Sequence, residues 1–308
     1  MSGSRHGAQG EAPAAPPRKD RIWTAGNGAI RTGWLLAASL FCYVLVAVAT
    51  RYGLIRAFRA LFDVWGVDSA NIHLAPVWAR MVYAWHDAFL ALVFAAATLL
   101  IARWLRRLWG LGMPLVQAPR GELWRSALAG VLSVALVAAL CLLPDSMRLE
   151  WPLTEPVIGW RLPVAALFSL ISVTAEEIFT KRVLYDGLGE RWNALWASVV
   201  VCAVSWLTGG LAGSAVGILN GLLLGWVGCA LYSLGGLWTS VGFVWGWRFA
   251  MTCILGFGGG EASVYRLYGV SEALLTGGDA GPMHGLWATA LLACIAAWTA
   301  IKKLRDNK

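Results

Sequence analysis

The amino-acid sequence predicts an all-α membrane protein, a polytopic bundle of about eight transmembrane helices. Its 308 residues are 58% hydrophobic and only 14% charged, and the mean hydropathy is +0.63, which is typical of membrane proteins and not of soluble domains. Apolar runs long enough to cross a bilayer recur along the chain, and a single span satisfies its backbone in hydrocarbon only as a helix. The net charge of +8 comes from Lys and Arg residues beside those runs, which indicates membrane flanks and argues against nucleic acid as a partner.

Composition divides the chain into two regions. Residues 1–32 are rich in Gly, Ala and Pro and carry basic residues, so we expect a disordered basic tail that buries no core. Residues 33–308 form the polytopic membrane domain. The first apolar run begins only near Trp34, too far along for a secretory signal peptide, and is interpreted as a retained anchor. The predicted transmembrane segments are residues 33–50, 86–103, 125–143, 160–175, 192–209, 212–233, 236–256 and 284–301.

The distribution of Lys and Arg predicts that both termini lie in the cytoplasm. The basic tail and residues 103–125, 181–191 and 302–308 fall on one side of the predicted bundle, and positive residues favour the cytoplasmic side. Arg51, Arg56 and Arg59 go against this rule. We therefore expect a multi-pass protein of a bacterial-type inner or plasma membrane, in contact with the lipid bilayer.

Cysteine and histidine residues give no sign of a metal site, and the cofactor stays unknown. The 6 cysteines lie singly in or beside apolar runs and are interpreted as small hydrophobic residues. The 4 histidines are scattered and no HExxH pattern exists, so no metal is expected. His284 stands at the start of a predicted helix, where a structural role is favoured over a ligand role.

One predicted helix carries a stripe of glycines. In GGLAGSAVGILNGLLLG, a glycine recurs at every fourth position, a spacing that lets another helix backbone approach closely in lipid. We interpret this stripe as architecture. Its members are Gly209, Gly213, Gly217, Gly221 and Gly225.

The stretch TAEEIFTKRVLYDGL, residues 174–188, places Glu176, Glu177, Lys181, Arg182 and Asp186 directly after an apolar run. One interpretation is a cytoplasmic loop, in which Glu177 and Lys181 form an exposed i,i+4 pair. The other interpretation is a site. Adjacent carboxylates near a bilayer repel each other and lose hydration, so they need a specific cationic partner.

The sequence AEEIFTKRVLYDGLGERWNALWASVV resembles the first motif of the CPBP family, the CAAX protease and bacteriocin-processing intramembrane endopeptidases. That motif has two Glu, three further residues and an Arg, and Lys181 stands here at the Arg position. GGLWTSVGFVWGWRF resembles the family's third motif, and LLTGGDAGP resembles a stretch common before the last helix. The resemblance covers about residues 160–301 and implies an intramembrane endopeptidase core.

The resemblance also implies a role for each motif position. Glu176 would activate water as the general base, with Glu177 and Lys181 as its supports. A His on the next helix would assist it, and a His and an Asn of the third motif would stabilise the oxyanion.

Three of these motif positions are substituted in this chain. Trp206 stands at the first His position, and Val244 and Arg248 stand at the third-motif His and Asn positions. An indole donates a hydrogen bond but accepts no proton, Val does neither, and Arg stays protonated. We therefore expect reduced or lost peptidase activity.

Arg248 lies well inside an apolar run, where an unpaired cation costs about 2.5–3.5 kcal/mol on insertion scales. The resemblance makes Glu176 and Glu177 its expected partners, because the third motif faces the first across the family's cavity. A glutamate bound to Arg is a poor general base, so an Arg at this motif position would stabilise the bundle and prevent catalysis by the glutamate. The alternative is that Arg248 extends to an interface beside Trp245 and Trp247.

Two classes of function stay open. The first is a CPBP relative with reduced or lost peptidase activity that keeps a cavity for a hydrophobic peptide, a lipid or a partner membrane protein. The second is an active Glu176-dependent endopeptidase that cleaves a prenylated or membrane-entering peptide. A transporter is a weaker alternative, because intramembrane Glu and Arg also mark transport paths. We favour the first class, because no His occupies a motif position.

Overall fold

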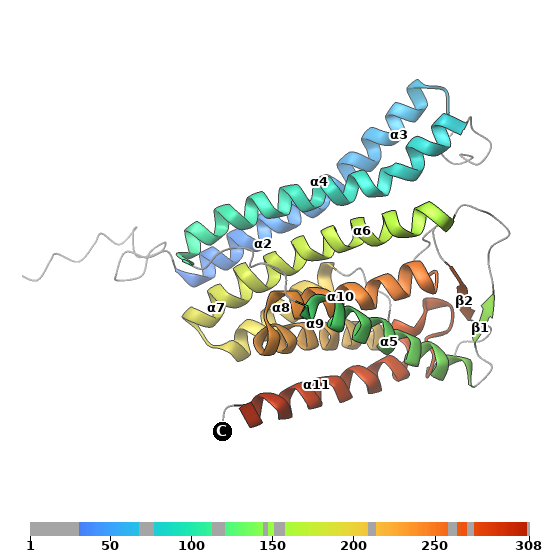
Figure 1. Ribbon diagram of the computed structural model, residues 1–308. Helices are drawn as coiled ribbons and strands as arrows, with labels where there is room; N and C mark the ends of the chain where they lie inside the picture. Colours follow the sequence, from blue (N-terminus) through green and yellow to red (C-terminus); the bar gives the residue numbers. More distant parts are fainter. Residues whose placement is uncertain are drawn as a thin grey trace, which may run out of the picture.

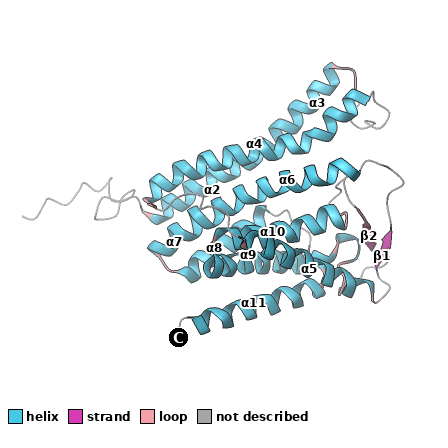
Figure 2. Ribbon diagram, in the orientation of Figure 1, coloured by secondary structure: helices cyan, strands magenta, loops and turns pink. Residues whose placement is uncertain are grey.

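The structure is a computed structural model whose described residues are mostly helical (Figure 2). It describes residues 31–67, 77–112, 121–143, 147–150, 158–208, 214–257, 264–269 and 274–306. Over these residues the predicted all-α class is confirmed, with one short strand pair as an addition. The predicted basic tail lies outside the described residues, apart from Arg31 and Thr32.

Among the described residues, π-helical segments follow three of the α-helices: η1 (Ala49–Leu54) follows α2 (Thr32–Val48), η3 (Ile178–Tyr185) follows α6 (Ile158–Glu177), and η4 (Ala250–Ile254) follows α10 (Leu237–Phe249). The strands β1 (Met147–Glu150) and β2 (Arg266–Gly269) pair antiparallel, from Met147 opposite Gly269 to Glu150 opposite Arg266. Two short 3₁₀ turns, η5 (Gly278–Ala280) and η6 (Pro282–His284), precede the last helix. The other elements are α3 (Ile55–Val64), α4 (Val77–Trp109), α5 (Glu122–Leu142), α7 (Asp186–Arg191), α8 (Ala194–Thr208), α9 (Ala215–Gly235) and α11 (Leu286–Asp306).

Six helical spans among the described residues are long and apolar enough to cross a membrane, which suggests a multi-pass membrane protein. They are Thr32–Val64, Ala88–Trp109, Glu122–Leu142, Leu162–Arg191, Ala215–Gly235 and Leu286–Arg305. Two further predicted segments, residues 192–209 and 236–256, coincide with α8 and α10, whose α-helical parts have only 15 and 13 residues. The predicted count of eight is therefore not confirmed.

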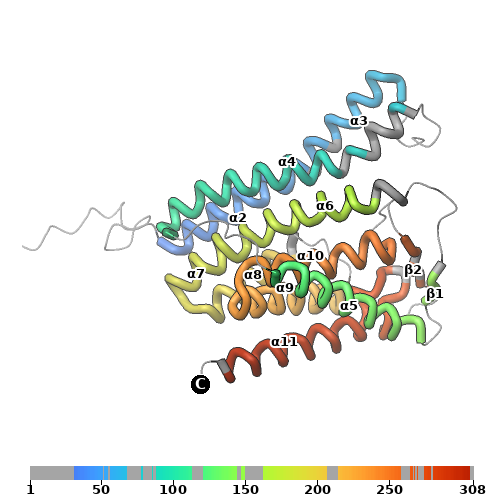
Figure 3. Tube along the Cα trace, viewed as in Figure 1, coloured from blue at the N-terminus to red at the C-terminus, as the bar shows by residue number. Residues whose placement is uncertain are grey.

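The helices form a bundle in which α10 is central. It packs against α5, α6 and α9, while α9 also contacts α8 and α11. In Figures 1 and 3, α6 lies between the α2 and α4 pair and the group that contains α8, α9 and α10, and α11 lies beyond that group. The β1 and β2 pair lies at the opposite end of the bundle from the end of α11. This arrangement brings residues of α2, α6 and α10 to one region.

The charged stretch at residues 174–188 is not an exposed loop. A continuous helical segment runs through α6, η3 and α7 to Arg191, well beyond the predicted end at residue 175. The loop interpretation was wrong because these charges are buried against the bundle and have partners there, so they do not end the helix.

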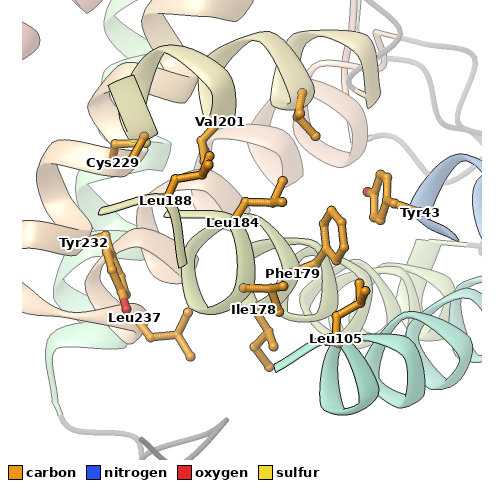
Figure 4. Packing of buried hydrophobic residues seen from close by; sticks show 14 of the residues in the cluster. Tyr43, Leu105, Ile178, Phe179, Leu184, Leu188, Val201, Cys229, Tyr232 and Leu237 are labelled. Carbon is orange, nitrogen blue, oxygen red and sulfur yellow. The ribbon is translucent and has the colours of Figure 1, made fainter. Parts of the chain in front are cut away.

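The core around η3 holds this segment in place. Figure 4 shows Ile178, Phe179, Leu184 and Leu188 pointing into a cluster with side chains from α2, α4, α8, α9 and α10. The rings of Phe179 and Tyr43 stack with 4.3 Å between their centroids. Thus α2, distant in the sequence, packs directly on the segment that carries the paired glutamates.

The described members of the predicted glycine stripe do face other parts of the protein. A Cβ on Gly225 would lie 3.0 Å from the Cα of Cys202 in α8, and a Cβ on Gly217 would lie 2.5 Å from the His284 ring. The first two members of the stripe lie outside the described residues. His284 also contacts the Ser214 hydroxyl, with Nδ1 and Oγ 2.8 Å apart, and burial lowers the pKa of its imidazole. These contacts support the structural role that was favoured for His284.

A close contact between α5 and α10 was not predicted. Gly130 of α5 and Gly242 and Gly246 of α10 let the two backbones approach so closely that a Cβ on any of them would overlap the facing helix.

We expect Gly246→Ala to lower the thermal unfolding temperature of the detergent-purified protein strongly. The added Cβ would overlap the Ala127 carbonyl group, and forced overpacking costs about 1–3 kcal/mol. The matched control is Gly189→Ala in α7, where an added Cβ meets nothing within 4 Å. Alanine is the better helix former, so the control should keep or raise the unfolding temperature. Equal temperatures for the two variants would contradict this packing.

Candidate functional site

The paired glutamates lie at the end of α6, where π-helix η3 begins. Residues 175–184 are all buried, so the bundle surrounds this stretch on every side. The Thr180 hydroxyl donates to the Glu176 carbonyl oxygen at 2.9 Å, which satisfies this polar side chain within its own helix. Short π-helical segments are rare and frequently mark functional positions.

Glu176 forms a bidentate ion pair with Arg248 of α10. Arg248 Nη1 lies 2.5 Å from Glu176 Oε2, and Arg248 Nη2 donates to Oε1 at 2.8 Å. The Glu176 side chain is 8% exposed and that of Arg248 is 32% exposed. Paired fork geometry of this kind is the strongest form of a charged hydrogen bond. The expected pair between Arg248 and a glutamate is therefore confirmed.

Glu177 belongs to a second, fully buried group. The Ser240 hydroxyl of α10 donates to Glu177 Oε2 at 2.5 Å, and Lys181 Nζ lies 3.7 Å from the same oxygen. The ammonium of Lys181 has no hydrogen-bond partner among the described residues. A Cβ on Gly228 of α9 would lie 3.3 Å from Lys181 Nζ, so the glycine leaves room for the lysine.

The two groups balance their charges. Glu176 is matched by Arg248 and Glu177 by Lys181, so these four side chains carry no net charge. An unmatched charge at this depth would be expensive, and here each charge has an opposite charge within 4 Å. The arrangement places a cationic side chain beside each carboxylate within an apolar bundle.

The other two substituted motif positions supply no proton acceptor. Trp206 lies near the end of α8, and its indole nitrogen is buried with no hydrogen-bond partner among the described residues. Val244 packs in a small apolar cluster with Ala127, Val173 and Trp245. No group of three or more His, Cys, Asp or Glu side chains in the described part of the chain could hold a metal ion.

The remaining charges of the stretch tie helices together. Arg182 Nη1 lies 3.7 Å from Asp186 Oδ2, and the Tyr232 hydroxyl of α9 donates to Asp186 at 2.8 Å. Arg106 of α4 donates to the Arg182 carbonyl oxygen at 3.1 Å. This cluster holds α4, η3, α7 and α9 together, and we interpret it as structural.

A cavity of about 510 Å³ lies beside the Glu176 and Arg248 pair, which forms part of its wall. Ser172, one turn before Glu176, is a further polar wall residue. Side chains of α2, η1 and α4 form the rest of the wall and are mostly apolar, among them Tyr43 and Phe94. The volume falls within the range of about 300–1,000 Å³ that is usual for small-molecule sites.

The cavity reaches the outer face of the bundle beside α2 and η1. Val44, Val48 and Tyr52 line it and are also exposed on the surface of these segments. In a membrane this apolar surface would face lipid. A ligand dissolved in the bilayer would therefore meet the cavity from the side.

Sequence reasoning missed two parts of this site. Ser240 lies eight residues before Arg248, a little over two helical turns, so the two side chains share a face of α10. That spacing was a usable signal for Ser240. The wall formed by α2 and η1 had no such signal, because its residues lie more than a hundred positions from the α6 residues that line the same cavity.

A search against protein-family models and a search of curated proteins found no match for this chain. The CPBP resemblance therefore rests on the motifs in the sequence, and what it implies about function is treated below as a proposal.

Proposed function

We propose that this protein is a non-catalytic relative of the CPBP intramembrane endopeptidases and that its cavity binds a hydrophobic ligand within the membrane. The observation that carries the proposal is the bidentate pair of Glu176 with Arg248 at the cavity wall. The residue that the resemblance assigns as general base gives both of its oxygens to a guanidinium. A carboxylate held in this way is a poor acceptor for a proton of water.

The surroundings of the pair support the same conclusion. Hydrolysis of an amide needs a base together with donors aimed at the developing oxyanion. The positions that would supply the histidines hold Trp206 and Val244, which bring no proton acceptor, and the third holds the partner of Glu176 itself. The four charged side chains form two ion pairs, so each carboxylate already has a cation beside it.

The cavity supports ligand binding. It is mostly apolar with a few polar groups, among them Ser172, Glu176 and Arg248, which is the usual composition of small-molecule sites. Its rim on α2 and η1 is exposed where lipid would lie. A lipid or a hydrophobic peptide segment would enter sideways from the bilayer and bury its apolar part between α2, α4 and α6.

Photo-crosslinking with a clickable, diazirine-bearing oleoyl lipid tests this proposal in the purified protein. We expect the label to concentrate on peptides that contain Val44, Tyr52 and Leu90, which line the cavity. Ala91→Trp should fill the cavity and reduce this labelling severalfold, because Ala91 is a lining residue.

The matched control for that experiment is Ala129→Trp, the same substitution at an exposed position of α5 outside the cavity. It should leave the labelling pattern unchanged. Label spread evenly over all lipid-facing helices, with no response to Ala91→Trp, would rule out the proposed site.

A further inference from the structure

The polar end of the cavity limits which ligands suit it. Arg248 uses two of its five N–H groups on Glu176, and its side chain remains 32% exposed at the wall. On η1 the Thr50 hydroxyl donates to the Val46 carbonyl oxygen at 2.7 Å. The wall beside Glu176 therefore offers donors from Arg248 to an oxygen acceptor that reaches it.

The charges around the cavity also limit which head group a ligand can carry. Glu176 neutralises Arg248, and Lys181 neutralises Glu177 just behind them. A charged head group entering this apolar region would lose hydration and find no unmatched counter-charge. An anion would meet the Glu176 carboxylate as a like charge, and a cation would meet Arg248 in the same way.

Size and shape are the third limit. A volume of about 510 Å³ suits a drug-sized ligand, such as a single acyl chain with a small head, better than a phospholipid with two chains. Tyr43, Leu90 and Phe94 give the chain an apolar wall, and the exposed rim gives it a path from the bilayer.

We propose that the ligand is a single-chain amphiphile with an uncharged head group that accepts hydrogen bonds, such as the ester and hydroxyls of a monoacylglycerol. This inference rests on the proposed function, because it specifies the ligand of the same cavity. The head group lies against the Glu176 and Arg248 pair and accepts from the free N–H groups of Arg248. The acyl chain extends between α2 and α4 toward the lipid.

The test is a competition experiment with the photo-crosslinking probe and three competitors of equal chain length. These are monooleoylglycerol, oleyl sulfate and oleyl trimethylammonium, whose heads are neutral, permanently anionic and permanently cationic. In the native protein we expect monooleoylglycerol to displace the probe at concentrations at least about tenfold lower than either charged competitor, equivalent to about 1.4 kcal/mol. A charged competitor that displaces the probe equally well would overturn the inference.

Two variants should change the order in which the three competitors displace the probe, each in favour of a different charged competitor. Glu176→Gln removes the carboxylate that binds Arg248 and should shift the preference toward oleyl sulfate. Arg248→Gln removes the guanidinium that binds Glu176 and should shift the preference toward oleyl trimethylammonium. Glu122→Gln, at an exposed position of α5, is the control and should keep the native order. If both cavity variants kept the native order, the pair would not set the selectivity.

These results separate the two proposals. If the native protein shows no specific labelling of the cavity, the proposed function fails. If labelling is specific but indifferent to head-group charge, only the present inference fails. Should a variant not fold, the order of the three competitors on the native protein still decides the question.

Discussion

Arg248→Leu should destabilise the protein more than any other single substitution of an exposed or half-buried cation. It leaves Glu176 buried at the wall of an apolar cavity without the guanidinium that holds both of its oxygens. Removing one member of a buried pair typically costs about 3–5 kcal/mol, and because Arg248 is partly exposed we expect a loss of about 3 kcal/mol. Chemical unfolding in mild detergent, followed by tryptophan fluorescence, measures this loss.

The double variant Arg248→Leu with Glu176→Gln should recover much of that loss. Removing both charges is much milder than removing one, so the two substitutions should be strongly non-additive. Arg125→Leu, an exposed arginine of α5, is the matched control and should change the unfolding free energy little. If the double variant were as unstable as the sum of the single variants, the ion pair would not be what Arg248 contributes.

The apolar pattern predicted the positions of the helices better than their ends. Every predicted segment overlaps a helix of the described structure, because long apolar runs have few alternatives in a membrane. The end at residue 175 was wrong because a composition rule treats Glu176, Glu177 and Lys181 as exposed charges. In the bundle each of these charges meets an opposite charge, so the helix continues to Arg191.

An ion pair of Arg248 with Glu176 or Glu177 was expected from the cost of a lone cation in an apolar helix together with the CPBP resemblance, and the structure shows Glu176 as the partner. The hydrogen bond of Ser240 to Glu177 was not predicted, although its spacing from Arg248 on α10 indicates a shared face. A serine in an apolar helix usually bonds to its own backbone, so its sequence context does not distinguish the two cases.

The rest of the site depends on packing between distant segments. The α2 and η1 wall, the π-helical turns beside Glu177 and Arg248, and the close contact of Gly246 with α5 all join parts of the chain that share no local pattern. Helix α3 was not predicted either. It is short and amphipathic, and its basic residues interrupt the apolar run by which transmembrane helices were recognised. The cytoplasmic placement of both termini stays a prediction from the distribution of Lys and Arg.

Cleavage of a prenylated peptide should be absent in the native protein and is expected only after the missing polar set is restored. The variant Trp206→His, Val244→His and Arg248→Asn frees Glu176 from its guanidinium and supplies the acceptor and donors that the CPBP resemblance assigns to these positions. Each restored oxyanion donor is typically worth about a hundredfold or more in turnover. Because Glu176 would be the general base, any activity that appears should be lost again on adding Glu176→Gln.

The measurement that tests the central claim most directly is therefore product formation from a prenylated peptide, followed by mass spectrometry, with the native protein and its Glu176→Gln variant in parallel. We predict that the two give the same background, because Arg248 occupies both oxygens of Glu176. Robust cleavage by the native protein that disappears in Glu176→Gln would contradict the non-catalytic account.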